Sequence, residues 1–464
     1  MSILALEFRS SYCVAKTLFK YFKLSDNQPC VYIYRNCTFY FLSRRFKTNM
    51  GVNVEVKSHV ENFTESAETE RKISLPSKDV LEYMNSKSSL KSILSDLPSK
   101  ILRRKMPRDS MYLVDEEVAR DIASDILDNI GERRNTPIFE INPGIGALSK
   151  ELLLGGVNCL HLCEHSKLFY RKMEMLLADF PTKTHLLQQD LLSLSKLSFL
   201  DKQVGGSRIE EVFRNVSKVN WNDYPPMIIV GAVPSLAFIR YLIYCHIHQT
   251  SILTYGRPEL YVVMSPSHYF YLASGKNDGY LYYRSLTVLF QLIFQFNVLR
   301  KVPRKAFLPW ETKRCLKKGA KLHKAQCIDP EFLYLVKIVP HRDFFERVVK
   351  VEELHQFWYF IFHHMVSRKN RVIPQLEKWI PGCGPRLITC DMTIFTEFGD
   401  LTPYQILSLF HEFTRWPEFS ECPFLSSMES TLMLMEKSSD EVKESHVRIE
   451  NEEEMREEYQ ESDS

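Results

Sequence analysis

Apolar positions follow two different periods along this chain, and the alternation between them predicts an α/β architecture. From Pro137 to Met264, short apolar runs alternate with segments whose apolar residues recur every three or four positions. The runs are typical of buried strands and the periodic segments of helices. We predict strands at Ile138–Ile141, Cys159–Leu162, Thr184–Gln188, Met227–Val230 and Leu260–Met264.

Helical segments separate and precede these strands. Ala147–Leu154 and Leu168–Leu177 follow the first two strands, and Val114–Ile130 precedes them with one apolar face. Strands that alternate with helices imply parallel βαβ units with right-handed crossovers. The predicted fold is therefore α/β, with a Rossmann-like parallel sheet.

The pattern weakens at both ends of this region and once inside it. Residues 51–97 are rich in Ser, Glu and Lys without a clear period, which predicts a linker or weakly ordered arm. Beyond about residue 305 strands fade, and helical segments such as Glu352–Val366 and Tyr404–Arg415 predict a second, smaller, helical domain. We divide the chain into 1–50, a linker at 51–97, a first domain at 98–304 with a polar insertion at 200–226, a helical domain at 305–430, and a tail at 431–464.

Charge is distributed unevenly along the chain. The whole sequence has 60 Lys and Arg against 57 Asp and Glu. The last 29 residues hold 12 acidic and 4 basic residues, so the remainder has 56 basic and 45 acidic residues. A basic body with an acidic tail suggests a polyanionic partner with which the tail can compete. A solvated body with a disordered tail is the alternative.

The N-terminal 50 residues have the composition of a mitochondrial presequence. They contain eight Lys and Arg, but only Glu7 and Asp26 as acids. An additional strand within Val31–Leu42 is the alternative. The 11 cysteines form no CxxC pair or Cys/His series, so we expect neither a metal site nor a disulfide scaffold. The sequence has no apolar run of 18 residues, so no membrane span is expected.

Acidic residues and glycines stand at the ends of successive predicted strands. Gly144 and Gly146 occupy the first strand-to-helix turn, where a missing Cβ lets a ligand approach the backbone. Glu164 follows the second strand and Asp190 the third. Each feature alone fits a tight turn, a helix cap or a surface charge. Their ordered combination predicts an S-adenosylmethionine pocket at the carboxyl edge of a parallel sheet.

Two motifs resemble those of the rRNA adenine N6,N6-dimethyltransferase family. Glu140–Leu148 resembles the family's first motif, with Asn142 where glycine is usual, and Val302–Pro309 resembles its Val-Pro, Ala-Phe and Pro block. Within that family, the runs Tyr255–Glu259, Leu333–Val336 and Ile338–Phe345 resemble the second paralogue of the mitochondrial transcription factor B branch. The resemblance covers roughly 98–420 and implies a methyltransferase fold that binds S-adenosylmethionine. The implied cofactor-binding residues are Leu113, Asn142, Gly144, Gly146, Glu164 and Asp190.

The segment that should grip the substrate departs from the family pattern. The family has Asn-(Leu/Ile)-Pro-(Tyr/Phe) after the fourth strand, whereas this chain has Ala232-Val233-Pro234-Ser235. Ala232 offers no acceptor for an adenine amino group, and Ser235 offers no ring, whose stacking contributes on the order of 1–3 kcal/mol per base. We therefore assign no catalytic residue, and any residual methyl transfer would depend on S-adenosylmethionine.

Cations and aromatic residues are interleaved from Arg300 to Lys324. This stretch has ten Lys and Arg and one acid, Glu311. Cations neutralise phosphates and aromatic faces stack on unpaired bases, so we predict a nucleic-acid surface; a solvated loop is the alternative. The predicted residues are Arg104, Lys105, Arg304, Lys305, Trp310, Lys313, Arg314, Lys317, Lys318, Lys321 and Lys324.

These observations favour a binding protein over an enzyme. The resemblance implies a transcription initiation factor of the mitochondrial matrix and nucleoid, whose partners are the mitochondrial RNA polymerase and melted promoter DNA. The alternative is an active methyltransferase that dimethylates adenines of mitochondrial small-subunit rRNA. A small-molecule methyltransferase is disfavoured because it would leave the basic surface without a role.

Overall fold

A computed structural model describes the body of the chain. The described residues are 78–99, 101–102, 110–278, 282–310 and 329–437, with two short strands, β1 (Ile33–Tyr34) and β2 (Cys37–Thr38). The chain divides into two units, Met1–Thr69 and Glu70–Ser464. In the first, β1 pairs antiparallel with β2. The rest of the predicted presequence and residues 438–464 of the predicted tail lie outside the described residues.

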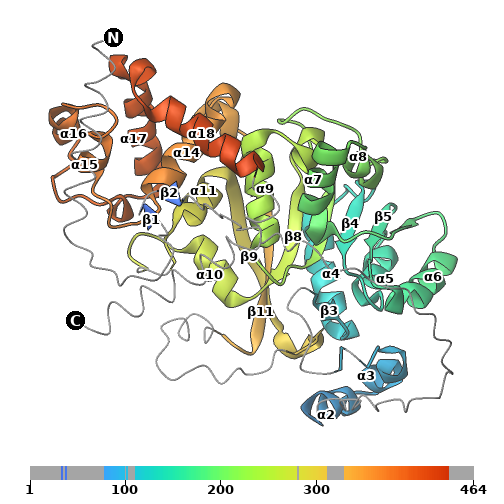
Figure 1. The fold of residues 1–464 in the computed structure, drawn as a ribbon. Helices are drawn as coiled ribbons and strands as arrows, with labels where there is room; N and C mark the ends of the chain where they lie inside the picture. The colour runs from blue at the N-terminus through green and yellow to red at the C-terminus, as the bar shows by residue number, and fades with distance from the viewer. Residues whose placement is uncertain are drawn as a thin grey trace, which may run out of the picture. The chain divides into compact units, whose positions relative to one another are not determined.

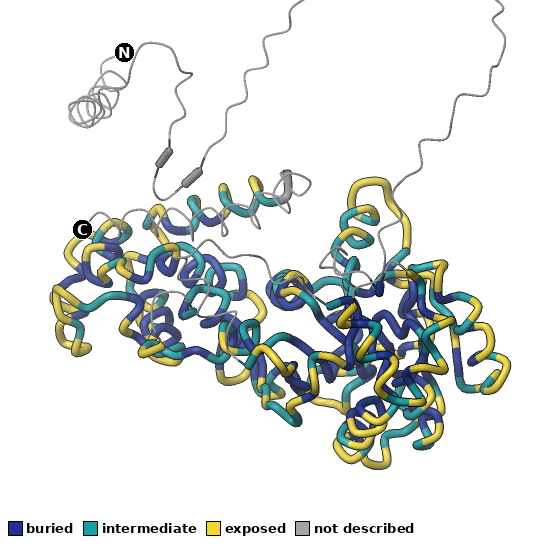
Figure 2. The backbone as a smooth tube through the Cα atoms, turned by 90° about the horizontal axis from the view of Figure 1, so that it is seen from below, coloured by how far each residue is buried: buried dark blue, intermediate teal, exposed yellow. Residues whose placement is uncertain are grey.

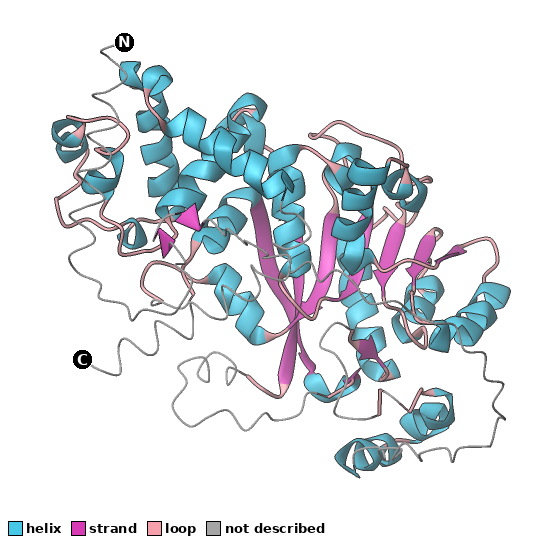
Figure 3. Cartoon of the chain, in the orientation of Figure 1, coloured by secondary structure: helices cyan, strands magenta, loops and turns pink. Residues whose placement is uncertain are grey.

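A seven-stranded sheet forms the centre of the second unit (Figure 3). Its order is β6-β5-β4-β7-β8-β11-β9, parallel from β6 to β8, with β11 antiparallel to both of its neighbours. The five predicted strands are confirmed to within two residues at each end. The strands are β4 (Ile138–Ile141), β5 (Leu160–Cys163), β6 (Thr184–Leu187), β7 (Ile228–Ala232), β8 (Glu259–Met264), β9 (Phe294–Pro303) and β11 (Phe332–Pro340).

Both faces of the sheet are covered by helices, which explains the continuous apolar runs (Figure 1). Phe139 and Ile141 point into one core cluster, with residues of α7 (Leu194–Val204) and α9 (Ala237–His248). Ile138 points into the other, with residues of α4 and α5. The helices of that second face are α4 (Glu116–Ile130), α5 (Ala147–Leu154) and α6 (Tyr170–Asp179), the last preceded by a 3-10 turn, η3 (Lys167–Phe169).

The expectation that strands fade beyond about residue 305 is wrong for one long strand. β11 lies beyond that point and sits between β8 and β9. Lys337 interrupts its apolar run, but its ammonium group pairs with the buried Glu259 carboxylate at 2.8 Å. β9 occupies an edge and carries exposed Lys301, so its apolar pattern is diluted. A charged residue with a buried partner is compatible with a central strand, which the pattern could not indicate.

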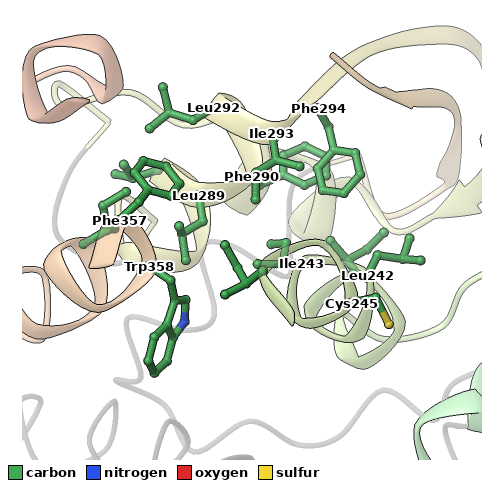
Figure 4. Close-up of a cluster of buried hydrophobic side chains, with 14 of the residues drawn as sticks. Leu242, Ile243, Cys245, Leu289, Phe290, Leu292, Ile293, Phe294, Phe357 and Trp358 are labelled. Carbon is green, nitrogen blue, oxygen red and sulfur yellow. The ribbon is translucent and has the colours of Figure 1, made fainter. Parts of the chain in front are cut away.

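The helical part shares one core cluster with the sheet. Phe290 on α11 (Ser285–Ile293) packs among residues of α9 and α14 (Leu354–His364), as Figure 4 shows. Figure 2 shows buried residues throughout the sheet region and the helical region. The predicted helices over Glu352–Val366 and Tyr404–Arg415 are confirmed. The remaining helices here are α10 (Pro266–Ala273), α13 (Phe344–Arg347), α15 (Val372–Leu376), α16 (Gly384–Thr389), α17 (Pro403–Arg415) and α18 (Phe424–Lys437).

Two segments expected to be irregular contain helices. The linker expected at 51–97 is wrong for Lys78–Leu97, which forms α2 (Lys78–Ser86), α3 (Ser88–Ile93) and a 3-10 turn, η2 (Leu94–Asp96). Several of their sparse apolar residues, such as Val80, Met84 and Leu90, are buried in a third cluster, which makes up for the polar composition. The polar insertion at 200–226 likewise contains α8 (Arg208–Val212), which is anchored by buried Ile209. Residues 51–77 lie outside the described residues.

No described helix combines the length and apolar character needed to cross a membrane.

Candidate functional site

The turn between β4 and α5 contains three residues in the left-handed region. Asn142, Gly144 and Gly146 have φ values of 48°, 61° and 79°. Asn tolerates this region better than other side chains do, which makes it a feasible replacement for the glycine that the resembling family has there. Gly146 is the N-cap of α5. The predicted glycine turn is thus present at the carboxyl edge of the sheet.

Glu164 and Asp190 follow β5 and β6, at the same edge of the sheet. The Glu164 carboxylate accepts hydrogen bonds from the backbone N–H of Gly144 at 3.1 Å and of Ser166 at 2.8 Å. Burial raises the pKa of Glu164, and these two N–H groups oppose that shift. Asp190 accepts from the backbone N–H of Leu192 at 3.0 Å and so caps the turn that follows it. Asp190 therefore has the capping role that its sequence alone also allowed.

Two buried polar side chains lie at the inner end of the glycine turn. Glu140 is 2% exposed and accepts a hydrogen bond of 2.6 Å from the Ser149 hydroxyl. Burial raises the pKa of Glu140 to about 8, against the effect of that hydrogen bond. Both polar atoms of the Asn142 side chain are buried without a hydrogen-bond partner among the described residues. Glu140 was not predicted as a site residue, although an acid inside an apolar strand run was a usable signal.

A small opening lies between these groups and the segment at the end of β7 that contains Gly231 and Ala232. It encloses about 310 Å3 of space between atoms, part of it open solvent, but only about 20 Å3 can take the centre of a water-sized sphere, so it is not a formed ligand cavity. Predicted residues Leu113 and Asn142 line it, together with Glu140 and Ala232. Gly144, Glu164 and Asp190 do not. A larger space of about 840 Å3 lies at the β6 edge against α8, and none of the predicted residues lines it.

The segment after β7 keeps its backbone arrangement but has small side chains. Gly231 has a φ of 135°, and a Cβ there would lie 2.7 Å from the carbonyl oxygen of Ile141. The backbone N–H of Val233 donates to the Val263 carbonyl at 2.8 Å. Ala232 is buried and Ser235 is exposed. This segment therefore offers an extruded base neither a side-chain amide nor an aromatic ring.

Three of the predicted nucleic-acid residues are described, and their polar groups shape a turn. Arg304 donates to the carbonyl oxygens of Phe307 at 2.9 Å and Pro309 at 3.2 Å. The Trp310 indole N–H donates to the Lys305 carbonyl at 3.1 Å. The other predicted cations lie outside the described residues: Arg104, Lys105, Lys313, Arg314, Lys317, Lys318, Lys321 and Lys324.

The residues at the sheet edge fit the groups of S-adenosylmethionine. A carboxylate such as that of Glu164 suits ribose hydroxyls, and glycines allow close approach to the backbone. Buried polar atoms without partners, such as those of Asn142, are unfavourable unless a ligand or water satisfies them. No group of three or more potential metal ligands occurs among the described side chains.

Comparison with known proteins gives consistent matches. The model of the family "Ribosomal RNA adenine dimethylase" matches residues 104–414. "Dimethyladenosine transferase 2, mitochondrial" of Drosophila melanogaster is 35% identical over 398 residues, which cover 77% of this chain and 88% of the fly protein. "Dimethyladenosine transferase 1, mitochondrial" of Macaca fascicularis is 24% identical over 191 residues, 40% of this chain and 50% of that protein. Among solved structures, the 23S rRNA methyltransferase ErmE superposes with a TM-score of 0.41 and 15% identity, over 66% of this chain and 100% of that chain.

Proposed function

The chain belongs to the ribosomal RNA adenine dimethylase family, and on this premise we propose that it acts in mitochondria mainly as a transcription initiation factor. In this proposal it assists the mitochondrial RNA polymerase by stabilising melted promoter DNA. S-adenosylmethionine is the cofactor of the family, and when bound it supplies an electrophilic methyl group. Glu164, Asn142 and the glycine turn are the groups that would hold it.

The loss of substrate-gripping side chains supports this proposal most strongly. Methylation of a base in structured nucleic acid requires the base to be extruded and held against the methyl donor. Ala232 provides a methyl group in place of an amide, and Ser235 provides a hydroxyl in place of a ring. The supporting backbone is intact, because Gly231 and Val233 keep the close strand contacts. A scaffold kept without its gripping groups is better suited to holding nucleic acid than to modifying it.

The proposed partners follow from charge and family resemblance. Among the ten cations between Arg300 and Lys324, Arg300 pairs with Asp125 and Lys301 with Asp329. We propose that the cations that follow them neutralise phosphates, with Trp310 as the aromatic residue for unpaired bases. The mitochondrial location rests on the fly relative, which is described as mitochondrial, and on the N-terminal composition. We place the protein in the matrix, associated with nucleoid DNA, with the first 50 residues as its targeting segment.

Run-off transcription tests this function directly. Purified polymerase would be assayed on a linear promoter template with and without the full-length protein, and we expect promoter-dependent transcripts only with it. A triple variant with Lys317, Lys318 and Lys321 changed to Glu should lose affinity for single-stranded DNA and show a shallower salt dependence. The matched control reverses three exposed cations elsewhere, Lys150, Lys167 and Arg171. Equal transcription with and without the protein would refute the proposal.

An active rRNA dimethyltransferase is the second candidate. The observation in its favour is that the cofactor side of the site is retained, with Glu164, Asp190 and the glycine turn all at the sheet edge. The same preparation should be incubated with labelled S-adenosylmethionine and a small-subunit rRNA hairpin. Stoichiometric methylation of adenine by the unchanged protein would reverse the ranking of the two functions.

A further inference from the structure

Glu164 is sealed inside the protein, although it is the carboxylate that suits ribose hydroxyls. Its side chain has 0% exposure. One carboxylate oxygen accepts from the Gly144 N–H and the other from the Ser166 N–H. A ligand hydroxyl can hydrogen-bond to this carboxylate only after neighbouring atoms have moved. The question is therefore which atoms cover it and what holds them in place.

An aromatic pair, Tyr112 and Phe169, covers the glycine turn. A Cβ added to Gly144 would lie 2.8 Å from a ring carbon of Tyr112, so this ring takes up the space that the glycine leaves. The Tyr112 ring contacts that of Phe169 with centroids 4.6 Å apart, and both residues are buried. Burial, followed by the charges of Glu164 and Asp190, raises the pKa of Tyr112 well above its usual value. Tyr112 thus packs against Gly144, whose backbone N–H donates to Glu164.

The helix pair α2–α3 packs on this aromatic pair. Val80, Met84 and Leu90 share a separate hydrophobic cluster with Tyr112 and Phe169. This cluster is distinct from the two that line the faces of the sheet. The aromatic pair is thereby held between the glycine turn on one side and α2–α3 on the other. Figure 1 shows α2 and α3 as the first helices of the described chain.

Polar contacts hold α2–α3 against the N-terminal end of α4. The Lys87 ammonium group lies 3.0 Å from Asp115 and 2.6 Å from Glu117, at the start of α4. The Tyr83 hydroxyl donates to the same Asp115 carboxylate at 2.9 Å. Lys87 is partly exposed and Glu117 is exposed, so their ion pair contributes modestly, whereas Asp115 is buried and its contacts with Lys87 and Tyr83 hold the helix pair more firmly. The arrangement is that of a fastened cover rather than a permanent core.

We propose that α2–α3 and the Tyr112–Phe169 pair form a lid over the nucleoside half of the cofactor site. S-adenosylmethionine reaches Glu164 only when this lid withdraws, so its apparent affinity is reduced by the fraction of molecules in which the lid is open. Segment Lys78–Asp96 therefore controls whether the family cofactor is bound. This inference concerns access to the cofactor site and stands independently of the proposed role in transcription.

The test compares two lid variants with wild type by calorimetric titration of S-adenosylmethionine into the full-length protein. Met84→Ala loosens the buried contact, and Lys87→Ala removes the ion pairs without touching the core. Met428→Ala, which removes a largely buried methionine of α18, is the matched control. We expect a gain in affinity of roughly tenfold for Met84→Ala, a smaller gain for Lys87→Ala and none for the control.

Hydrogen exchange gives a second readout that does not depend on activity. Saturating S-adenosylmethionine should accelerate amide exchange in Val80–Leu97 of the wild-type protein, because the bound form has the lid withdrawn. Slower exchange there on binding would mean that α2–α3 completes the site, and would overturn the proposal. So would unchanged or weaker binding by both lid variants, including the absence of measurable binding in all four proteins. Run-off transcription by these variants reports separately on the proposed function.

Discussion

The two halves of the site differ in what has been kept. In the nucleoside half, at the ends of β5 and β6, two acids are present and hydrogen-bonded internally: Glu164 accepts two backbone N–H groups and Asp190 caps a turn. In the substrate half, at the end of β7, the backbone is preserved while Ala232 and Ser235 lack the groups needed to orient an adenine. The comparison teaches that backbone geometry and chemistry can be separated within one sheet edge.

The difference follows from the structural duties of the residues. Glu164 and Asp190 hold the backbone of their own turns, so replacing them would cost stability whether or not they bind a cofactor. Ala232 contributes a buried methyl group to a core cluster and Ser235 is exposed, so neither side chain has a comparable polar duty. At this sheet edge, polar side chains are thus present where they also hold the fold.

Gly231→Ala should have the largest effect on stability, because Gly231 on β7 pairs with Ile141 on β4, where the two halves of the site meet. Its φ of 135° disfavours any side chain, and the new Cβ would lie 2.7 Å from the Ile141 carbonyl oxygen of the adjacent strand. Backbone strain and overpacking together should cost about 2–5 kcal/mol of unfolding free energy. Chemical denaturation measures this. Gly205→Ala, at a positive φ with no atom near the added Cβ, is the control that isolates strain from crowding.

Restoring the substrate half should produce the next largest change. Ala232→Asn with Ser235→Tyr supplies an amide acceptor and a ring, and stacking alone contributes about 1–3 kcal/mol per base. Methyl transfer to a small-subunit rRNA hairpin should therefore rise by about 5- to 150-fold over the unchanged protein. Ser235→Leu in place of Ser235→Tyr adds bulk without a ring and serves as the control. No gain from the restored pair would mean that the nucleoside half is also incapable of supporting chemistry.

The sequence predicted the carboxyl edge of the sheet well, because motif residues there sit at the ends of short, fully buried strands. It failed where a charged or polar residue has a partner distant in sequence. β11 was missed because Lys337 interrupts its apolar run, and the carboxylate that pairs with Lys337 belongs to Glu259 on another strand. The helices at Lys78–Ile93 were missed because their apolar residues are few and are buried only by packing in one cluster with Tyr112 and Phe169, which are distant in sequence. The lid over Glu164 could not be predicted, since it depends on how three separate segments pack.

Glu140→Gln should sharpen the comparison by removing a buried carboxyl group that destabilises the folded protein when it ionises. The pKa of Glu140 is about 8 in the folded protein, above its ordinary value of 4.5. The folded state therefore binds the proton more tightly, and the stabilisation that this gives below pH 4.5 is lost as the pH rises toward 8. Glu140→Gln should abolish this loss, so its unfolding free energy should exceed that of wild type at pH 8 and approach it at pH 5. Thermal unfolding between pH 5 and pH 8.5 measures it, and exposed Glu174→Gln is the control.

The smallest predicted effect separates the two duties of Asp190. Asp190→Ala removes the acceptor for the Leu192 N–H and should cost about 1 kcal/mol of unfolding free energy. Asp190→Asn keeps a cap of similar strength, so it should cost only a few tenths of a kcal/mol. If Asp190 also serves the cofactor, the Ala variant should lose affinity for S-adenosylmethionine, measured in the Met84→Ala background where the lid is loosened. Full affinity in that double variant would reduce Asp190 to a helix cap, and the nucleoside half would then depend on Glu164 and the glycine turn alone.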